Sequence, residues 1–269
     1  MTAFDVVTVI HDSAPQLTRL LESIERHAKQ ARVIVVDTGS TDDGAERARE
    51  WAAEVIELDH NPGFGSANNL GIQSARHDVT ALLNPDVELL DDGLTNLVER
   101  ARTTAALLAP RLLNDDGTIQ DSAHPAPGTW REIGRALTPP PLQRPPWRSN
   151  DRQQVGWATA AALVARTDTL KRLGPFDPHA FLWYEDMDLC LRAERVELHP
   201  DVTLTHTGGH STGEDYEERA RRRREVVAQR RGRRAQALDD LAQAITFARA
   251  APFKPRARAQ LRALRRARG

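Results

Sequence analysis

Oxygen-bearing side chains follow the ends of apolar segments in the N-terminal part of the chain. Asp37 follows RVIVV, and Asn84 and Asp86 follow DVTALL. A carboxylate at a strand end can accept hydrogen bonds from a nucleobase or a ribose, although Asp37 also suits a turn or a helix cap. Mg²⁺ and Mn²⁺ prefer oxygen ligands and need only one or two protein carboxylates when they bind diphosphates, so Asn84 and Asp86 are candidate ligands. The alternative for NPD is a proline turn.

A second acidic cluster, YEDMD, holds Glu185, Asp186 and Asp188 at the expected start of a helix. One of these carboxylates could act as a general base that takes a proton from an attacking hydroxyl. Crowded carboxylates raise one another's pKa toward a useful range. The alternative is that the helix dipole stabilises acids at this position without any chemistry. His206, in HTGGHST, could ligate a metal or cap a loop, and His210 has the same two interpretations.

The segment NPGFGSANNLG has two glycines where the backbone must turn or approach a ligand closely. It is not a dinucleotide fingerprint, because the third glycine is missing and the segment follows the third strand rather than the first. The alternative is a tight loop capped by Asn68 or Asn69. Taken alone, the segment indicates a binding loop without identifying its ligand.

Alternating strands and helices must position these residues. Apolar strands are expected at residues 4–10, 32–36, 54–58 and 78–83, and a helix is expected from leucines at i, i+3 and i+4 spacing after Pro15. This alternation predicts an α/β fold with a mainly parallel sheet flanked by helices. Ligands of such sheets bind beyond the carboxyl ends of the strands, and this rule gathers Asp37, Asn61 and Asp86 at one rim.

The rest of the chain changes character twice. Residues 124–152 are rich in proline and lack periodic apolar positions, which predicts a long loop that serves as a lid or binding segment or is disordered. Structure is expected to resume at VGWATAAALVAR, and VTLTH reads as a further short strand. From Tyr216 onward the chain is helix-prone and strongly basic.

Composition excludes several classes of protein. The chain has 269 residues, 40% hydrophobic and 28% charged, a globular balance with enough material for a sizeable core. The single cysteine, Cys190, excludes an intramolecular disulfide and suits a reducing compartment. The longest strongly apolar run, residues 157–165, is far shorter than the roughly twenty residues of a membrane-spanning helix. With no signal-peptide pattern at the N-terminus, a cytoplasmic location is expected.

The net charge of −1 conceals a strong asymmetry. Residues 216–269 carry 17 Lys and Arg against 5 Asp and Glu, whereas residues 1–215 carry 20 against 33. The apolar positions Leu238, Leu241 and Ile245, continued by Ala248, recur at helical spacing between the basic clusters. This pattern favours reversible contact of the tail with an anionic membrane surface. The alternative is a solvated, arginine-rich helical end whose apolar positions pack on the rest of the protein.

Five motifs in order carry a family resemblance: VDTGSTDDG, NPGFGSANNLG, LLNPDVEL, GPFDPHAFLWYEDMDLCLR and HTGGHST. Together they closely resemble the inverting GT-A glycosyltransferases of family 2, and in particular the bacterial rhamnosyltransferases of cell-wall and polysaccharide synthesis. The resemblance covers about residues 4–212. It implies a nucleotide-sugar-binding part at residues 1–123, an acceptor-binding and catalytic part at 124–212, and a basic helical tail at 213–269.

The resemblance also implies roles for individual residues. The residues expected to bind the nucleotide sugar are Asp37, Ser40, Asn61, Gly63, Asn69, Asn84 and Asp86. Asp86 and His206 would hold Mg²⁺ or Mn²⁺ at the diphosphate. Asp186 would be the catalytic base, with Glu185 as its acidic neighbour. The chain departs from the branch in a shorter stretch before His206 and in Thr159-Ala160, where the branch usually has Ser-Gly, so different acceptor contacts are expected.

The function expected from these features is inverting sugar transfer to a hydroxyl of a glycan or polyprenyl-linked acceptor, at the inner face of the cell membrane. The expected donor is dTDP-L-rhamnose, with UDP-galactofuranose as the alternative. A sugar-phosphate nucleotidyltransferase would need a glycine-rich, basic phosphate loop after the first strand, where this chain has IHDSAPQ. A non-catalytic sugar-nucleotide binder, or a nucleic-acid binder that uses the basic tail, is the remaining alternative, although nucleic acid is not the expected partner.

Overall fold

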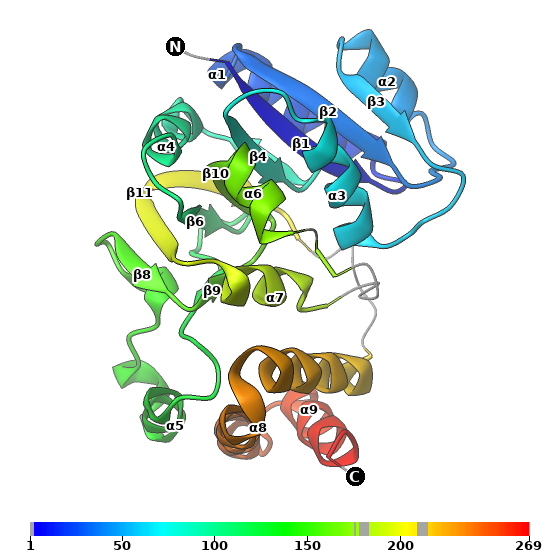
Figure 1. The fold of residues 1–269 in the computed structure, drawn as a ribbon. Helices are drawn as coiled ribbons and strands as arrows, with labels where there is room; N and C mark the ends of the chain where they lie inside the picture. Colours follow the sequence, from blue (N-terminus) through cyan, green and yellow to red (C-terminus); the bar gives the residue numbers. More distant parts are fainter. Residues whose placement is uncertain (1–2, 175, 178–182, 209–214, 269) are drawn as a thin grey trace. The chain divides into compact units, whose positions relative to one another are not determined.

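The structure is a computed structural model that describes residues 3–174, 176–177, 183–208 and 215–268. The chain divides into two compact units, residues 1–124 with 146–209 and residues 125–145 with 210–269 (Figure 1). We call them the sheet unit and the helical unit. Among the residues described here, no helix is both long enough and apolar enough to cross a membrane.

The sheet unit is built on one nine-stranded sheet in the order β3-β2-β1-β4-β10-β6-β11-β5, with β8 paired to β11. Its strands are β1 (Phe4–Ile10), β2 (Ala31–Asp37), β3 (Glu54–Glu57), β4 (Val79–Leu83), β5 (Val87–Leu89), β6 (Leu107–Leu113), β8 (Gln153–Val155), β10 (Ala162–Arg166) and β11 (Val196–His206). A separate pair joins β7 (Ala123–His124) to β9 (Trp157–Ala158). The strands β1 to β4 run parallel, whereas β10 lies antiparallel between β4 and β6.

Helices cover both faces of this sheet (Figure 1). They are α1 (Ala14–His27), α2 (Gly44–Glu50), α3 (Phe64–Ser74), α4 (Gly93–Ala101) and α6 (Thr167–Leu173), whereas α7 (Glu185–Arg192) packs mainly on β9. Leucines of α1 and α4 pack in one core with the β1 residues Phe4, Val6 and Ile10. On the opposite face α3 approaches β1 so closely that a Cβ on Gly71 would lie 2.3 Å from Val7 Cγ1. The alternation of side chains along β1 therefore separates the two helical layers.

The predicted α/β class is confirmed, and each of the four strands expected in the N-terminal part is present. The parallel half of the sheet places the loops after β1, β2 and β4 at one edge, as the sequence predicts. The other half has mixed directions because β10 returns antiparallel to β4. The segment 124–152 is not the predicted long loop, since it contains α5 (Trp130–Leu137) and two 3₁₀ turns, Pro140–Leu142 and Pro146–Arg148.

The helical unit consists of α5, α8 (Tyr216–Ala250) and α9 (Pro255–Arg266). A small core joins α5 to α8, where Ile133 and Ala136 pack with Ala242 and with the partly buried Leu238 and Ile245. Residues 125–145 therefore group with the C-terminal helices, whereas the family resemblance implies that they belong to the catalytic part. The reason is that α5 buries its apolar side against α8 rather than against the sheet.

The apolar stripe expected on the tail is divided between two environments. Leu238 and Ile245 pack toward α5, whereas Leu241 is 46% exposed. The helix itself is interrupted at Gly232, whose φ of 85° and ψ of 166° are not helical. A positive φ costs glycine little, so this position can bend α8 without the strain that a side chain would add. The tail is thus a folded helical unit rather than one continuous amphipathic helix.

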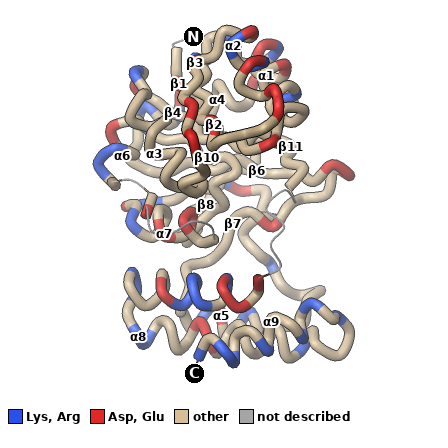
Figure 2. Tube along the Cα trace, turned by 90° about the vertical axis from the view of Figure 1, so that its right-hand side faces the viewer, with Lys and Arg blue, Asp and Glu red and all other residues tan. Residues whose placement is uncertain are grey.

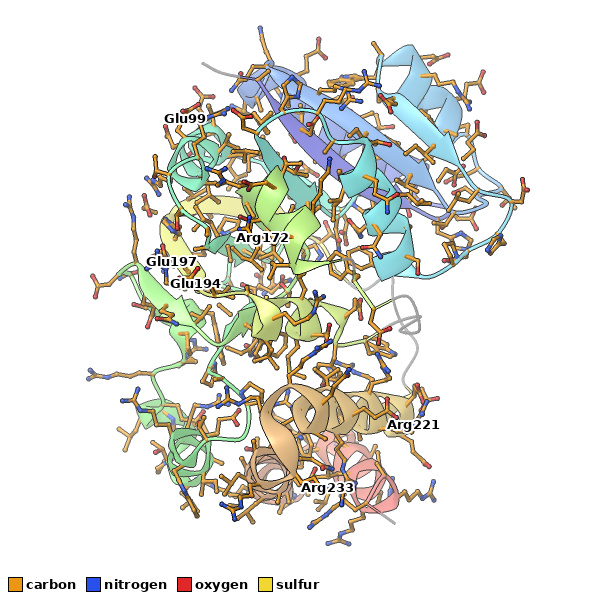
Figure 3. The ribbon with its side chains drawn as sticks, in the orientation of Figure 1. Glu99, Arg172, Glu194, Glu197, Arg221 and Arg233 are labelled. Carbon is orange, nitrogen blue, oxygen red and sulfur yellow. The ribbon has the colours of Figure 1, made fainter. Side chains whose placement is uncertain are left out.

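Basic residues are distributed along α8 and α9 (Figure 2). Some are neutralised inside the unit, because Arg223 forms two hydrogen bonds with the buried Asp239, at 2.9 and 2.7 Å, and Arg224 lies 3.3 Å from Asp240. Others surround the Gly232 bend, where Arg231, Arg233 and Arg234 are exposed and form no ion pair with any described residue. Figure 3 labels Arg221 and Arg233 on α8.

Candidate active site

The loops after β1 and β2 are locked together around Asp37. Asp37 is 5% exposed, and its Oδ1 accepts hydrogen bonds from the amide and the hydroxyl of Ser40 at 3.0 and 2.5 Å. Ser40 Oγ in turn accepts from the amide of Asp12 at 3.0 Å. The turn role considered for Asp37 is therefore real, and it holds Asp37 and Ser40 next to each other at the end of β2.

Asp12, which belongs to none of the sequence motifs, also joins the loop after β1 to the loop after β2. It has a positive φ of 47°, which is uncommon for a residue other than glycine. Its Oδ1 accepts from the amide and hydroxyl of Thr41 at 2.7 and 3.1 Å, and these bonds bring the pKa of Asp12 below its ordinary value. The unfavourable backbone conformation of Asp12 persists because these hydrogen bonds enforce it, so the loop has one defined shape.

The glycine-rich segment opens α3 and anchors a distant part of the chain. Asn61 Oδ1 accepts from the amide of Gly63 at 2.9 Å, and Gly63 has a φ of 91°. Further along, the Asn69 amide bonds both backbone groups of Phe176, at 3.0 and 2.7 Å. A Cβ on Gly65 would lie 2.7 Å from Phe176 Cβ, so this glycine leaves room for the same anchor. Asn69 therefore acts by fixing the backbone of Phe176 against α3.

Asn84, Asp86 and His206 meet at the edge of the sheet where β4 and β11 end and β5 begins. His206 Nε2 lies 3.3 Å from Asp86 Oδ1, and the amide of Gly208 donates to Asp86 Oδ2 at 3.0 Å. Burial alone would raise the pKa of Asp86, but the hydrogen bond and charge of His206 outweigh it and lower the pKa below its ordinary value. Asn84 Nδ2 lies 3.5 Å from the same imidazole nitrogen.

The donor set of this edge fits a divalent cation. It offers a 7% exposed carboxylate, an imidazole nitrogen, and the Oδ1 atom of Asn84, which is buried and has no hydrogen-bond partner among the described residues. No group of three or more His, Cys, Asp and Glu residues in the described part of the chain could enclose a metal. Such a sparse set suits Mg²⁺ or Mn²⁺, which commonly completes its coordination with substrate phosphates and water.

The acidic cluster lies on the first turn of α7, where the dipole favours negative charge. The structure separates the three acids by environment. Glu185 is buried, Asp186 is partly exposed, and Asp188 is 2% exposed with Arg192 Nε 3.0 Å from its Oδ2. Arg192 also donates to the carbonyls of Leu173 and Gly174, so Asp188 serves the packing of α7. Asp186 is the acid most open to a substrate.

The loop between β9 and β10 contacts both α7 and the sheet edge that carries Asn84 and Asp86. Cys190 Sγ of α7 lies 3.5 Å from the carbonyl of Ala158, which ends β9. Three residues further on, the carbonyl of Ala161 accepts from the amide of Asn84 at 2.9 Å. Burial raises the pKa of the Cys190 thiol to about 12, so this cysteine packs rather than reacts. The departure at Thr159-Ala160 therefore lies on the loop that joins the two clusters.

An aromatic group supports the start of α7. The rings of His124 and Trp157 are stacked with centroids 3.9 Å apart, and Tyr184 packs edge-on to Trp157 at 6.2 Å. Trp183 and Tyr184 both have positive φ, 78° and 61°, immediately before Glu185. Backbone strain of this kind persists where the surroundings enforce it and is common at functional sites. His210, and part of the segment before α7, lie outside the described residues.

Comparison with known proteins places this geometry in a family. The family described as Glycosyl transferase family 2 matches residues 5–154. The chain belongs to glycosyl transferase family 2. It is similar to the N-acetylglucosaminyl-diphospho-decaprenol L-rhamnosyltransferase of Mycobacterium tuberculosis, with 28% identity over 238 residues that cover 78% of each chain.

Solved structures of glycosyltransferases share the fold of this family 2 chain. The mannosyltransferase PcManGT from Pyrobaculum calidifontis, in complex with GDP-Man and Mn²⁺, matches with a TM-score of 0.63 and 16% identity, over 99% of this chain and 86% of that one. S. aureus TarS 1–349 in complex with UDP-GlcNAc matches with a TM-score of 0.59 and 19% identity, over 99% and 80%. A longer TarS chain is matched over 44% of its length. At these identities the likeness establishes the fold alone.

Proposed function

We propose that this family 2 glycosyltransferase moves a sugar from a nucleotide sugar to a hydroxyl of a glycan or lipid-linked acceptor in cell-envelope or polysaccharide synthesis. The observation that carries the proposal is the pair formed by Asp86 and His206, 3.3 Å apart at the carboxyl edge of the sheet. Asp37 ends β2 at the same edge, Ser40 lies in the loop that follows, and both would receive the nucleoside. The diphosphate would then lie between them and the sugar.

Asp86 and His206 would hold Mg²⁺ or Mn²⁺, and the buried Oδ1 of Asn84, which has no hydrogen-bond partner among the described residues, would be a further candidate ligand. When bound, the cation stabilises the negative charge that develops on the leaving diphosphate. The protein holds both oxygens of Asp86 in advance, one at His206 and the other at the Gly208 amide. A site organised before the substrate arrives does not have to reorganise during the reaction.

Asp186 would act as the general base, with the buried Glu185 as its acidic neighbour. Its carboxylate takes the proton of the acceptor hydroxyl while the hydroxyl oxygen attacks the anomeric carbon. The bond from this carbon to the diphosphate oxygen breaks, and its electron pair leaves with the diphosphate. A single displacement from the opposite face inverts the anomeric configuration. Holding donor and acceptor in line supplies much of the acceleration.

The proposed donor is dTDP-L-rhamnose, and UDP-galactofuranose is the second candidate. Support comes from the mycobacterial relative, whose name specifies L-rhamnosyl transfer to a decaprenol-linked sugar. No described residue distinguishes a deoxysugar by its contacts, so the donor rests on this similarity. The acceptor, a polyprenyl-linked glycan, rests on the same relative.

Peripheral contact with an anionic membrane is the proposed route to such an acceptor. Large apolar side chains with more than a third of their surface exposed gather in the helical unit: Trp130, Leu137, Leu142, Leu241 and Phe253. The same unit carries the exposed arginines around Gly232. Apolar side chains that enter the headgroup region and cations that attract anionic lipids together produce reversible binding. Nucleic acid is the other anionic partner, but it gives no role to the exposed leucines of this unit.

The decisive experiment is a donor screen with the purified full chain. Release of nucleoside diphosphate from dTDP-L-rhamnose, UDP-galactofuranose and common UDP-, GDP- and dTDP-sugars is measured with a short polyprenyl-diphosphate-linked acceptor and Mn²⁺. Turnover with one donor, and an anomeric proton of inverted configuration in the product, are expected. Binding of sugar nucleotides without turnover of any of them would instead favour a non-catalytic binder.

A further inference from the structure

Gln120 contacts the candidate ligand His206 from the side opposite Asp86. Its Oε1 lies 2.7 Å from His206 Nδ1, and its Nε2 donates to the carbonyl of His206 at 3.3 Å. Gln120 follows the hairpin turn at residues 114–118, in the loop between β6 and β7. It has no place in the five sequence motifs, and nothing in the proposed mechanism uses it.

Two independent contacts set the orientation of the Gln120 amide. The backbone carbonyl of His206 can only accept, so the Gln120 group that faces it must be the NH₂. The same Nε2 lies 3.0 Å from Asn114 Oδ1. The amide oxygen of Gln120 is therefore the group that faces Nδ1 of the imidazole.

A chain of hydrogen bonds that ends on a carboxylate sets the polarity of Asn114 as well. Thr118 Oγ1 donates its one proton to Asp116 Oδ1 at 2.6 Å, because a carboxylate only accepts. The Thr118 oxygen must then accept from Asn114 Nδ2, which lies 2.9 Å away. The other end of the Asn114 amide, its oxygen, is thereby directed to Gln120. Each group in this series of hydrogen bonds is thus either a donor or an acceptor, without conflict.

The consequence for His206 is a defined position of its proton. Since Gln120 Oε1 only accepts, Nδ1 carries a hydrogen, and Nε2 of the neutral ring is left with its lone pair. Nε2 faces Asp86 Oδ1 at 3.3 Å. Two acceptors at that distance repel each other unless a proton or a metal ion lies between them. Either a second ring proton or a metal ion satisfies this requirement.

We propose that Gln120 is a positioning residue that holds His206 in its Nδ1–H form and so presents Nε2 as a ligand for the divalent cation at Asp86. This inference rests on the proposed function, because it deepens the account of the cation site. Outer-shell partners of metal-bound histidines fix the tautomer and ring orientation in the same way, and their loss typically weakens metal affinity 10–100-fold.

The test measures Mn²⁺ binding by the full chain from the electron paramagnetic resonance signal of free Mn²⁺, with dTDP present. Gln120→Leu is expected to weaken Mn²⁺ binding by about tenfold or more. Gln120→Glu keeps an acceptor for Nδ1–H but loses the donor to the His206 carbonyl and Asn114 Oδ1, so it is expected to bind Mn²⁺ more tightly than Gln120→Leu. Gln154→Leu, the same change at an exposed position of β8, controls for the loss of a glutamine.

A second measurement follows the ring directly. Nitrogen-15 spectra of the histidine-labelled, metal-free protein, with His206→Gln for assignment, are expected to show a protonated Nδ1 in the wild type and its loss in Gln120→Leu. An Nε2–H tautomer in the wild type, or wild-type Mn²⁺ affinity in Gln120→Leu, would overturn the inference while the proposed function stands. If the wild type binds no Mn²⁺ even with dTDP, the cation site of the proposed function fails and this inference fails with it.

Discussion

His206 Nε2 lies 3.3 Å from Asp86 Oδ1, although the two residues are far apart in the chain. The antiparallel pairing of β11 with β5 creates this proximity, because His206 is the register partner of Val87, the residue after Asp86. The backbone after β11 then returns across Asp86, where the Thr207 amide donates to its carbonyl at 3.1 Å. The end of β11 thus holds Asp86 by both its side chain and its backbone.

Asp86→Asn is expected to weaken Mn²⁺-dependent binding of a nucleoside diphosphate by at least about tenfold, the loss that even an outer-shell partner of a metal ligand produces. The amide keeps the size of the side chain and can still accept from Gly208, so the change removes charge rather than packing. Calorimetric titration with dTDP or UDP, in Mn²⁺ and in excess EDTA, measures the effect. Equal wild-type affinity in Mn²⁺ and EDTA would contradict a metal role for this residue.

Asp186→Asn is expected to lower kcat by about 10²–10⁴-fold, the contribution of a positioned general base, and to leave donor binding unchanged. Asp186 lies partly exposed on the first turn of α7, where an asparagine is tolerated. Rate assays combined with donor titration separate the two effects. A mutant within tenfold of the wild-type rate would remove Asp186 from the mechanism.

Asp188→Asn is the matched control, two residues further along the same helix. Here the expected loss is in stability, because the change weakens a buried contact with Arg192 at 3.0 Å. Breaking one partner of a buried ion pair costs about 3–5 kcal/mol when the other charge stays buried, and the partly exposed Arg192 should cost less. Urea unfolding measures this loss. A rate defect in Asp188→Asn without any loss of stability would mean that the two acids have been assigned the wrong way round.

Much of the fold followed from periodicity in the sequence. The strands β1 to β4 and the helix after Pro15 appear where apolar spacing places them, and the rule for strand ends brings Asp37 and Asp86 to one edge. These features are local, or depend only on parallel order, so a sequence reveals them. The proximity of His206 to Asp86 instead depends on pairing between distant strands, which residue spacing does not encode.

The helix α5 was missed for a different reason. Prolines on both sides of residues 130–137 suggested a loop, although a capping pattern was present: Thr129 accepts from the amide of Glu132, as the S/T-x-x-E motif predicts. Gln120 had no comparable signal. Its role depends on which side chains its loop meets, and only the contact with His206 reveals it.

Asn69→Ala is expected to destabilise the sheet unit by about 2–3 kcal/mol, because it leaves both backbone groups of the buried Phe176 without the Asn69 amide. The segment that contains Phe176 leads toward α7, so turnover should fall together with stability. Hydrogen exchange in α3 and α7, compared with turnover, measures both. Asn68→Ala is the control, since among the described residues the amide of Asn68 bonds within α3, to the Phe64 carbonyl.

Asp5 is expected to give the sheet unit acid-sensitive stability. It is fully buried and accepts from Arg32 at 2.7 Å and from the amides of Arg76 and His77 at 2.7 and 2.6 Å. Burial alone would raise the pKa of Asp5, but the bonds from His77 and Arg32 outweigh it and lower the pKa below its ordinary value. A lowered folded-state pKa stabilises the protein above the unfolded-state pKa, and that contribution is lost as the pH falls.

Asp5→Asn is therefore expected to cost about 3 kcal/mol near neutral pH, and the difference from the wild type should shrink below about pH 4. Asp5 is the second residue of β1, near the amino end of the strand, so kcat of the folded enzyme should be unchanged. Urea unfolding at several pH values checks the stability, and a difference that does not depend on pH would contradict the assignment. Glu54→Gln, at the more exposed partner of Arg32, is the control.

The helical unit is expected to bind anionic vesicles through the exposed side chains that it does not use for packing. Replacing Arg231, Arg233 and Arg234 by glutamine removes about 3 kcal/mol of attraction if all three face the lipid, at about 1 kcal/mol for each residue. None of the three forms an ion pair with a described residue, so folding should be preserved. Co-sedimentation with vesicles of phosphatidylcholine and phosphatidylglycerol measures the loss, which added salt should reproduce in the wild type.

The apolar contribution is tested separately by Phe253→Ser, at a side chain that is 84% exposed in the turn between α8 and α9. Its matched control is Leu90→Ser, a change to a 48% exposed apolar residue of the sheet unit. Phe253→Ser should weaken vesicle binding and Leu90→Ser should not, because burial of an aromatic side chain in lipid contributes about 1.5–3 kcal/mol only where the side chain reaches it. Equal losses in the two variants would show that the helical unit is not the surface that meets the membrane. Equal binding of the wild type to vesicles of phosphatidylcholine alone would contradict the contribution of the arginines.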